Sequence, residues 1–461
     1  MPAFPGINST EVIDWAKSIS GPTMLKGTGA AFTLTGTSAT AISDPQYPAS
    51  TTRGVAYLDG TFYVLAPNGT IYNSLAAGDD PTDWPADGFI SAEFESDQGV
   101  FIAKCLNNIV VLGQWTTQLF WDAANATGSP LLPVQNGVIL IGCASANSVA
   151  QTESTIIWMA QRKAQGSTAH LGRFIAILVG TSYEELSTPD VSRVLDADDL
   201  TNVRSCVMEM SGHTWYVLAL GTTGITLVFD LKTKGWFVWT RLAVGAALTV
   251  ASVTQTNGLA TAISTGHGIQ DGDPVVVSGV TPAGFNGTFN VSVTTSGTNS
   301  FTYPLNTTGT STGTGGSMQA TPYTEGAFAF VASLGYGGYQ IAMDTAGNTY
   351  RLSLGTALDD GSIPINWRVR TMNMDEGNRN YKTYEAVTVV GDLAGTATGL
   401  VRYTADDYQT FGYFRRFDMA QIKNGEHRWG AHRQIAWEWR YTDRERLRIK
   451  ALDVDITQGV T

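Results

Sequence analysis

Residues 212–239, GHTWYVLALGTTGITLVFDLKTKGWFVW, decide the fold class of this chain. Apolar, β-branched and aromatic residues alternate along 215–219 and 225–229, which is typical of half-buried β-strands. The segment 231–235 supplies a chain reversal before the aromatic strand 236–240. Together these features predict one four-stranded antiparallel unit, the pattern of a propeller blade.

The composition of the whole chain favours the same class. Fifty glycines and only 15% charged residues in 461 fit short strands joined by tight turns. Nine Asn-Gly or Asp-Gly pairs supply the positive φ angles that hairpin turns need. We therefore expect an all-β protein, a divergent β-propeller of about six blades. The strand clusters lie near 54–72, 99–121, 137–160, 171–187, 203–240, 326–354 and 384–456.

Helix is expected in only two short segments. Residues 8–17 contain Ser9 or Thr10 as a possible cap. Residues 188–196 start with Thr188 as a cap and Pro189 at the first helical position. Both segments are short enough to be surface connections between strands.

A change in composition marks an inserted module. No Lys or Arg lies between Arg241 and Arg351, and from 242 to 324 the only charged residues are Asp271 and Asp273. Thr, Ser, Gly and Val dominate this stretch, and its strand and turn signals predict a small β module. We expect three parts: residues 1–245 as the first part of the propeller, 246–322 as the inserted domain, and 323–461 as the second part, which closes the ring of blades.

The distribution of charge bears on the partners of the protein. The net charge is -12, and residues 1–365 hold 13 Lys/Arg against 27 Asp/Glu, whereas residues 366–461 hold 15 against 13. An acidic surface repels phosphate, so a protein that grips nucleic acid is not expected. A conduit through which DNA slides avoids cationic traps, and an acidic lining suits it. The charge is equally explained as a device for solubility.

Four places in the chain together resemble a known family. In residues 212–239 a Gly-His pair precedes an aromatic strand, a Thr-Leu-Val-aromatic-Asp strand and a Thr-Lys-Gly-Trp turn. The others are Arg53-Gly54 leading into GTFYVLAPNGTIY at 60–72, LSTPDV at 186–191, and the C-terminal run 437–456. The sequence is similar to the packaged-DNA stabilisation, or tail hub (nozzle), proteins of short-tailed, podovirus-type phages.

This resemblance implies a structural protein of the virion and not an enzyme. It implies a homo-oligomeric ring, a hexamer, below the portal and adaptor complex of the tail, assembled in the host cytoplasm. Such a ring retains packaged DNA, later gives double-stranded DNA a non-specific passage, and anchors a tail fibre, spike or needle. Its subunits meet through head-to-tail interfaces whose rotation closes. No leader or long apolar run is present, so no membrane insertion is expected.

Residues with catalytic or metal-binding chemistry are scattered. The five histidines show no HxH or HExxH spacing, and His213 is interpreted as a hydrogen-bonded turn residue. Cys105, Cys143 and Cys206 lie in apolar strands without CxxC spacing, which indicates buried reduced thiols. We expect no catalytic residue, no metal and no cofactor.

One motif leaves a second hypothesis open. Residues 404–411, TADDYQTF, resemble the Asp-box hairpin of sialidase-like propellers, with Tyr408 in place of its glycine. The structural residues of this turn are Thr404, Asp406, Thr410 and Phe411. The alternative function is a carbohydrate-binding or degenerate glycosidase-like propeller used in host recognition. Its candidate residues are Arg368, Arg370, Arg402, Arg415, Arg416, Glu385, Asp406 and Asp407.

The segment 433–456 alternates arginine with apolar residues. Nucleic-acid binding is one interpretation, because arginine and aromatic side chains stack on bases. We favour strands that close the propeller, because interleaved acids, Glu438 among them, repel phosphate. Arg444, Arg446 and Arg448 are then candidates for contacts with other subunits or partners.

Overall fold

The computed structural model confirms an all-β chain. It describes residues 12–458 apart from 28, 37, 93–96, 126, 165–169, 294–298, 306–308, 328–329, 337–338, 345, 353–357, 360–362, 393–397, 420–425 and 443–446. The chain forms two compact units, one of Met1–Trp239 with Ala327–Leu352 and the other of Thr240–Gly326 with Ser353–Thr461. None of the helical segments within the described ranges is long and apolar enough to cross a membrane.

The first unit is a β-propeller of six sheets, each made of strands that run antiparallel to their neighbours. The first two sheets are β1 (Asp14–Lys17), β2 (Thr23–Lys26), β3 (Ala31–Thr35), β4 (Ser38–Ala41), and β5 (Ala56–Leu58), β6 (Thr61–Leu65), β7 (Thr70–Asn73), β8 (Phe89–Ser91). The third is β9 (Gly99–Cys105), β10 (Asn108–Gly113), β11 (Thr117–Asp122) and β12 (Leu131–Ile139).

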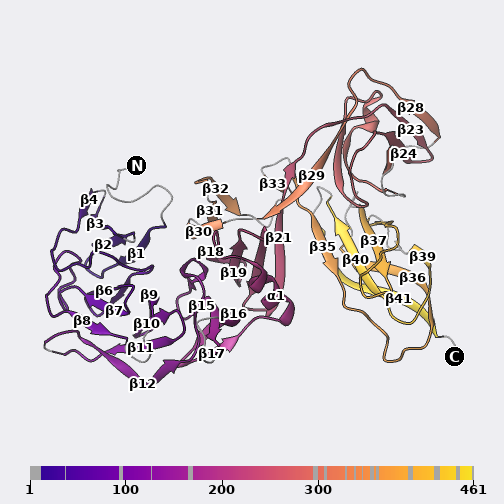
Figure 1. Ribbon diagram of the computed structural model, residues 1–461. Helices are drawn as coiled ribbons and strands as arrows, with labels where there is room; N and C mark the ends of the chain where they lie inside the picture. Colours follow the sequence, from indigo (N-terminus) through magenta and orange to yellow (C-terminus); the bar gives the residue numbers. More distant parts are fainter. Residues whose placement is uncertain are drawn as a thin grey trace. The chain divides into compact units, whose positions relative to one another are not determined.

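The other three sheets continue in chain order (Figure 1). The fourth is β13 (Gly142–Cys143), β14 (Ala150–Gln151), β15 (Ile156–Lys163), β16 (His170–Val179) and β17 (Ser182–Glu185), with the 3-10 turn η1 (Ala146–Ser148). The fifth is β18 (Arg204–Met210), β19 (His213–Leu220), β20 (Ile225–Asp230) and β21 (Gly235–Val244), and the sixth is β30 (Phe330–Tyr336), β31 (Tyr339–Asp344) and β32 (Thr349–Leu352).

Each sheet of the propeller packs on the next through a buried apolar core. A fully buried aromatic residue such as Trp158 of β15 joins the third sheet to the fourth, and Tyr216 of β19 joins the fourth to the fifth. Phe330 of β30 packs with Met208 of β18 between the fifth sheet and the sixth. Because apolar area removed from water is the main favourable term in folding, this succession of cores holds the blades together.

The stretch that predicted the blade supplies three of its four strands. Residues 212–239 form β19, β20 and the first half of β21, with Trp215 paired to Asp230 and Phe229 to Trp236. The fourth strand, β18, lies upstream of the quoted segment and pairs with β19 along its whole length. Alternation along a strand predicts the strand but leaves its outer neighbour undetermined.

The expected helix at 8–17 is wrong for its second half. Asp14–Lys17 is strand β1, which pairs antiparallel with β2 in the register Asp14 to Lys26; residues 8–11 lie outside the described residues. A helix this short is marginal by itself. Pairing with β2 supplies the backbone hydrogen bonds that local helix formation would have made.

The second expected helix is present as α1 (Pro189–Ala197). The Thr188 side chain accepts a hydrogen bond from Val191 N at 3.4 Å, and Pro189 occupies the first turn. Asp190 adds a negative charge at the positive end of the helix dipole. Leu195 and Val191 are buried and fix the helix against β16.

Removing this cap gives a first testable prediction. Thr188→Ala is expected to lower the stability of α1 by about 0.5–2 kcal/mol, because Val191 N loses its partner. Hydrogen exchange of the peptide covering α1 measures the change. Ser192→Ala, inside the same helix, is the control and is expected to be neutral or slightly stabilising, since alanine is the better helix former. Equal exchange rates in the two variants would contradict the capping role.

The second unit contains two β regions. The first comprises β22 (Leu248–Thr249), β23 (Ser252–Thr256), β24 (Leu259–Ile263), β25 (Pro274–Ser278), β26 (Gly287–Asn290), β27 (Ser300–Pro304), β28 (Thr310–Gly313) and β29 (Gln319–Ala327), with the 3-10 turn η2 (Ala283–Phe285). Its strands surround one core that includes Val253, Phe285 and Phe301. Below we call residues 246–322 the module.

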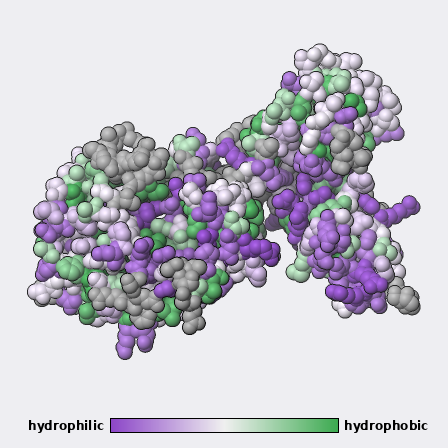
Figure 2. Space-filling view, in the orientation of Figure 1, coloured by the Kyte–Doolittle hydropathy of each residue, from purple (hydrophilic) through white to green (hydrophobic). Residues whose placement is uncertain are grey.

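The other region consists of the C-terminal strands. These are β33 (Leu358–Asp359), β34 (Ile363–Pro364), β35 (Trp367–Arg370), β36 (Lys382–Gly391), β37 (Thr398–Thr404), β38 (Arg415–Asp418), β39 (Glu426–His432), β40 (Ala436–Tyr441) and β41 (Ile449–Gln458). The sheets β35-β40-β37-β38 and β39-β36-β41 share a core with the buried side chains of Trp429 and Trp437. In Figure 2 their surface is mostly deep purple, whereas that of the module is paler.

The two units divide the chain differently from the expected boundaries. Residues 327–352 group with Met1–Trp239, whereas 353–461 group with 240–326. From the sequence, the whole of 323–461 is expected in the propeller. Alternating residues reveal strands, but they do not say which sheet a strand joins.

Candidate functional site

The side chain of Arg53 joins several sheets of the propeller. Its Nε and Nη2 atoms donate to the two carboxylate oxygens of Asp14 at 2.8 and 2.7 Å, which is the two-pronged geometry that suits arginine. Its Nη1 atom donates to Asn147 Oδ1, and its guanidinium lies 6.0 Å from the centre of the Phe101 ring. Asp14 belongs to the first sheet, Phe101 to the third and Asn147 to the fourth.

The polar contacts continue toward the last sheet. Ser205 of β18 donates to the carbonyl oxygen of Asn147 at 3.0 Å. Ser333 of β30 donates to the carbonyl oxygen of Val207, which is also on β18. Hydrogen bonds thus accompany the apolar cores from the first sheet to the sixth.

The backbone conformation and surroundings of position 54 explain why a glycine follows Arg53. Its φ is +87°, and a Cβ atom there would lie 2.0 Å from the carbonyl oxygen of Ile102, so only glycine fits. Gly54 N also donates to Asp14 Oδ2 at 2.7 Å. The Arg-Gly motif therefore fastens adjacent sheets. The sequence indicated the motif but not its partners Asp14 and Asn147.

Two other motifs of the resemblance contact one another. Trp236 Nε1 donates to the carbonyl oxygen of Leu186 at 2.7 Å, although 50 residues separate them in the chain. Ser187 Oγ accepts from Ile175 N at 2.7 Å, so the segment 186–188 is held by β16 as well. These contacts tie the fifth sheet to the connection that follows the fourth.

His213 is hydrogen-bonded, as expected, but it is the first residue of β19 and not part of the turn before it. Its Nδ1 atom lies 2.7 Å from Asp230 Oδ2. Burial acts to raise the pKa of Asp230, but bonds from Lys232 N, His213 and Thr233 outweigh it and leave the pKa lowered. The Asp230 carboxylate closes the turn before β21, which is a structural role.

The three cysteines are buried free thiols, as expected. Burial raises the pKa of Cys143 and Cys206 to about 12. A thiol nucleophile reacts as the thiolate, so these groups are inert near neutral pH. Within the described residues, no group of three His, Cys, Asp or Glu side chains is arranged to hold a metal ion.

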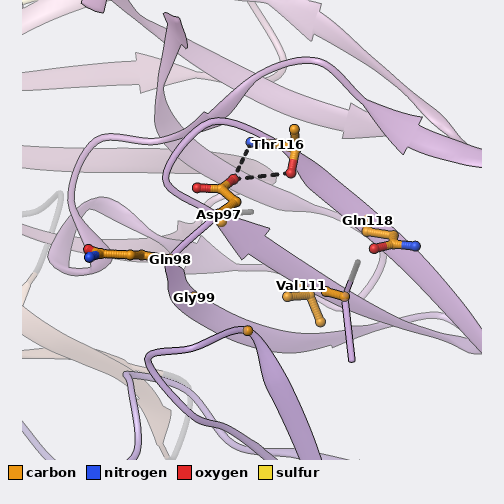
Figure 3. Close-up of a pocket in the computed structure, with 9 residues that line it drawn as sticks. Asp97, Gln98, Gly99, Val111, Thr116 and Gln118 are labelled. Carbon is orange, nitrogen blue, oxygen red and sulfur yellow. Dashed lines mark hydrogen bonds between the residues drawn. The ribbon is translucent and has the colours of Figure 1, made fainter. Parts of the chain in front are cut away.

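A small pocket lies between the second and third sheets, and Figure 3 shows its lining. Asp97 Oδ2 accepts hydrogen bonds from Thr116 N at 2.8 Å and from Thr116 Oγ1 at 3.1 Å. It also accepts one from Trp115 N at 2.8 Å. The carboxylate therefore braces the turn between β10 and β11. The remaining lining residues are Gly69, Ala92, Gln98, Gly99, Val111, Gly113 and Gln118.

The Asp-box-like turn has the hydrogen bonds of a hairpin brace. Asp406 Oδ1 accepts from Thr404 Oγ1 at 2.8 Å and from Thr410 N at 2.9 Å, and the Thr410 hydroxyl donates to Oδ2. The Thr410 hydroxyl and the other bonds lower the pKa of Asp406 to about 2. Tyr408 has a φ of +65°, which is why a glycine suits this position. The turn follows β37 in the second unit, outside the six sheets of the propeller.

Three arginines converge on Glu438, which stands out in the sequence only as one of the acids within 433–456. The Glu438 side chain is fully buried and accepts from Arg370 Nε, from Arg402 Nη2 at 2.8 Å and from Arg440 Nε at 3.0 Å. The Phe411 ring lies 4.3 Å from the guanidinium of Arg402. Arg370 and Arg402 were candidates for binding a sugar carboxylate, but here they bind a carboxylate of the protein itself.

Several other residues of the carbohydrate hypothesis are also engaged within the fold. Arg415 stacks on Trp429 at 4.0 Å and donates to a backbone oxygen. Asp407 accepts from Asn373 and Gln434 side chains. Glu385 Oε1 accepts from the Thr457 hydroxyl, and Arg368 lies on β35. This arrangement gives the second hypothesis no specific support.

The three C-terminal arginines are only partly described. Arg444 and Arg446 lie outside the described residues. Arg448 is exposed and pairs with Asp392, with Nε donating to Oδ2 at 2.8 Å. The hydrogen bond to Asp392 raises the pKa of Arg448. A role of these residues in contacts with partners stays a prediction.

The geometry thus defines a structural β-propeller, in which the polar groups described above mainly fasten sheets and turns. The family described as "Bacteriophage P22 Gp10, beta-propeller", a phage stabilisation family, matches residues 18–255, more than half of the 461. The chain belongs to this family, and it is a phage structural protein of the class that stabilises packaged DNA. Residues 256–461 lie outside the match.

Comparison with solved structures gives weak likenesses. BamB from Moraxella catarrhalis shares 12% identity over 74% of this chain and 96% of its own, with a TM-score of 0.30. The nidogen/laminin complex shares 12% identity over 50% of this chain and 79% of the matched chain, with a TM-score of 0.31. The extracellular domain of the putative one component system BT4673 from B. thetaiotaomicron shares 11% identity over 90% of this chain and 47% of its own, with a TM-score of 0.34. Similarity this low has no bearing on function, and no curated protein matches the chain.

Proposed function

We propose that this chain is the tail hub, or nozzle, of a short-tailed phage. Copies of it form a ring, a hexamer, below the portal and adaptor complex. The ring retains the packaged DNA, later conducts it, and anchors a fibre, spike or needle. The protein does this without a catalytic group, a metal or a cofactor, and it is assembled into the tail in the host cytoplasm.

The match to the phage stabilisation family over residues 18–255 is the observation that carries the proposal. The matched residues include Arg53 and Trp236, whose side chains fasten the sheets of the propeller. A wall that withstands the pressure of packaged DNA needs this kind of cross-linking between blades more than it needs a reactive pocket. The excess of acidic residues in 1–365 supports a passage from which phosphates are repelled.

Electron microscopy of the protein with its adaptor tests the ring. A closed ring of subunits below the adaptor is the expected image, and six-fold symmetry is the expected symmetry. Particles with single copies bound at scattered sites would contradict the hub function. Imaging the protein without its adaptor is a poor test of the ring, because a ring of this kind can require the adaptor in order to close.

For the module we propose a role outside DNA retention. Residues 246–322 form an inserted domain that contacts a fibre or the host surface. Its nearly uncharged composition and its own core support independent folding. This proposal includes domain boundaries. The two parts of the propeller are 1–245 and 323–352, and a further domain is 353–461.

A clean deletion of the module is possible at its base. Gly245 N donates to the carbonyl oxygen of Pro322 at 2.8 Å, so the ends of 246–322 lie one hydrogen bond apart and a two-residue turn can join them. We expect the deleted protein to enter tails that retain DNA but adsorb poorly. Normal adsorption would show that the module is only a spacer.

A further inference from the structure

The module has two carboxylates, and both lie on one turn. Asp271 and Asp273 are the only charged residues from 242 to 324, and Gly272 lies between them. Asp273 Oδ1 lies 3.8 Å from Arg440 Nη1 on β40. Asp271 accepts hydrogen bonds from Val293 N at 3.1 Å and from the backbone of Phe414. The turn thus faces the C-terminal sheet that contains β40.

Opposite charges meet at this contact. Three guanidiniums surround the single carboxylate of Glu438, so positive charge is in excess around it. The carboxylates of Asp271 and Asp273 supply two negative charges, and Asp271 also attracts Arg402. Opposite charges that meet at a contact from which water is partly excluded attract more strongly than they do in water.

The shapes fit as closely as the charges. Gly272 has a φ of +84°, and a Cβ atom there would lie 2.3 Å from Cε2 of Phe414 and 3.1 Å from Arg440 Nη1. The Phe414 ring is itself held, with the guanidiniums of Arg402 and Arg440 4.3 and 5.0 Å from its centre. The ring therefore has little freedom to give way to a larger residue at 272.

A second contact flanks the turn. Asn290 Nδ2 donates to the carbonyl oxygen of Gly272 at 3.2 Å, and Asn290 Oδ1 accepts from the hydroxyl of Thr442. Asn290 is the last residue of β26, and Thr442 directly follows β40. One amide side chain thus bridges the turn and the sheet.

We propose that Arg402, Arg440 and Phe414 form a binding pocket for an acidic turn, and that Asp271-Gly272-Asp273 of the same chain is its ligand. The occupied pocket fixes the module on the C-terminal sheet, so that the two regions move together. The proposal does not depend on the tail-hub function, because it concerns the isolated chain.

Two glycines with similar backbones make a matched test. Gly268 has a φ of +64° with no atom within 4 Å of a built Cβ, whereas Gly272 has a φ of +84° and meets Phe414. Gly268→Ala and Gly272→Ala therefore share the backbone strain and differ in the clash. In the purified full chain, hydrogen exchange of peptides 411–418 and 436–442 is measured by mass spectrometry. We expect Gly272→Ala to speed it about tenfold or more, and Gly268→Ala to leave it unchanged.

Charge is tested separately from shape. Asp273→Lys places a positive charge beside Arg440 and is expected to speed exchange in the same peptides about tenfold. Asp392→Lys, which disrupts the exposed pair with Arg448 on the same C-terminal region, is the control and is expected to leave them unchanged. Retained protection of β23 and β24 shows that the module stays folded.

Two results would overturn the proposal. If Gly272→Ala and Gly268→Ala gave the same exchange rates in the sheet peptides, the turn would not be docked there. If Gly272→Ala sped exchange but Asp273→Lys did not, the contact would be one of shape only, and the pocket would not select an acidic turn.

Discussion

Replacing Glu438 by glutamine is expected to lower the stability of the C-terminal sheets by about 3–5 kcal/mol. The carboxylate is fully buried, and Arg370, Arg402 and Arg440 all donate to it. A glutamine amide fills the same space but has no charge, and its NH₂ group faces donors where it finds no acceptor. The cost arises because the arginines lose their counter-charge inside the fold. The free energy lost in this way is larger than the net free energy gained when such a pair forms.

The measurement is the free energy of opening of β37 and β40, from hydrogen exchange of peptides that cover them. Asp392→Asn is the matched control, since Asp392 also binds two cations, Arg448 and Lys450, but at the surface. Solvent screens such pairs, so this variant is expected to exchange like the wild type. Equal losses in both variants would mean that burial of Glu438 adds nothing.

The same substitution predicts a dependence on pH. Burial acts to raise the pKa of Glu438, but the arginines outweigh it, and the pKa lies below 4.5. A carboxyl group with a lowered pKa stabilises the folded state above the pKa of the unfolded chain, and this is lost as pH falls through the folded value. The difference in the free energy of unfolding between wild type and Glu438→Gln is therefore expected to be full near neutral pH and to shrink below pH 4.5.

The two aspartates of the module, Asp271 and Asp273, have raised pKa values, because burial outweighs the effect of their partners. Their effect on the pH dependence of stability is therefore opposite to that of Glu438. They are common to both proteins, so they largely cancel in the difference.

The fold class and the approximate number of blades can be predicted from the sequence. Which strands form those blades cannot. Alternation in 203–240 and the Asn-Gly turns correctly predict antiparallel sheets. The strand cluster at 384–456, however, lies in the second unit, and the propeller instead contains β1–β4. The strands β1–β4 have only four or five residues each, too few for a reliable period, so pairing between them decides their structure.

The same limit applies to the functional residues. Arg53-Gly54 and Trp236 stand out as motifs, but the partners of Arg53 lie 39 and 94 residues away in the chain. Glu438 looks in the sequence like one acid among several in a solvated strand. Its role follows from antiparallel pairing of β40 with both β35 and β37, which places Arg370 and Arg402 opposite it. Such cross-strand neighbours cannot be assigned before the strand order is known.

Replacing Arg53 by methionine is expected to have the largest effect in the propeller, a loss of about 3–5 kcal/mol. The Arg53 and Asp14 side chains are only 18% and 10% exposed, and Arg53 also donates to Asn147. Without the guanidinium, Asp14 keeps Gly54 N at 2.7 Å and the more distant Lys26 Nζ at 3.9 Å. Methionine retains most of the apolar length of arginine, so the loss reports on charge and hydrogen bonds.

Hydrogen exchange of β1, β9 and β18 measures how far the loss spreads, and a double-mutant cycle with Asp14→Asn isolates the pair. We expect a coupling energy between Arg53 and Asp14 of about 0.5–3 kcal/mol. Arg193→Met is the control: Arg193 pairs with Asp190 along the surface of α1, with 77% and 84% exposure, and such pairs contribute about 0.3–0.5 kcal/mol. If faster exchange were confined to β1, Arg53 would hold only the first sheet. Faster exchange in β1, β9 and β18 together means that one side chain couples blades far apart in the chain, as the proposed wall around packaged DNA would require.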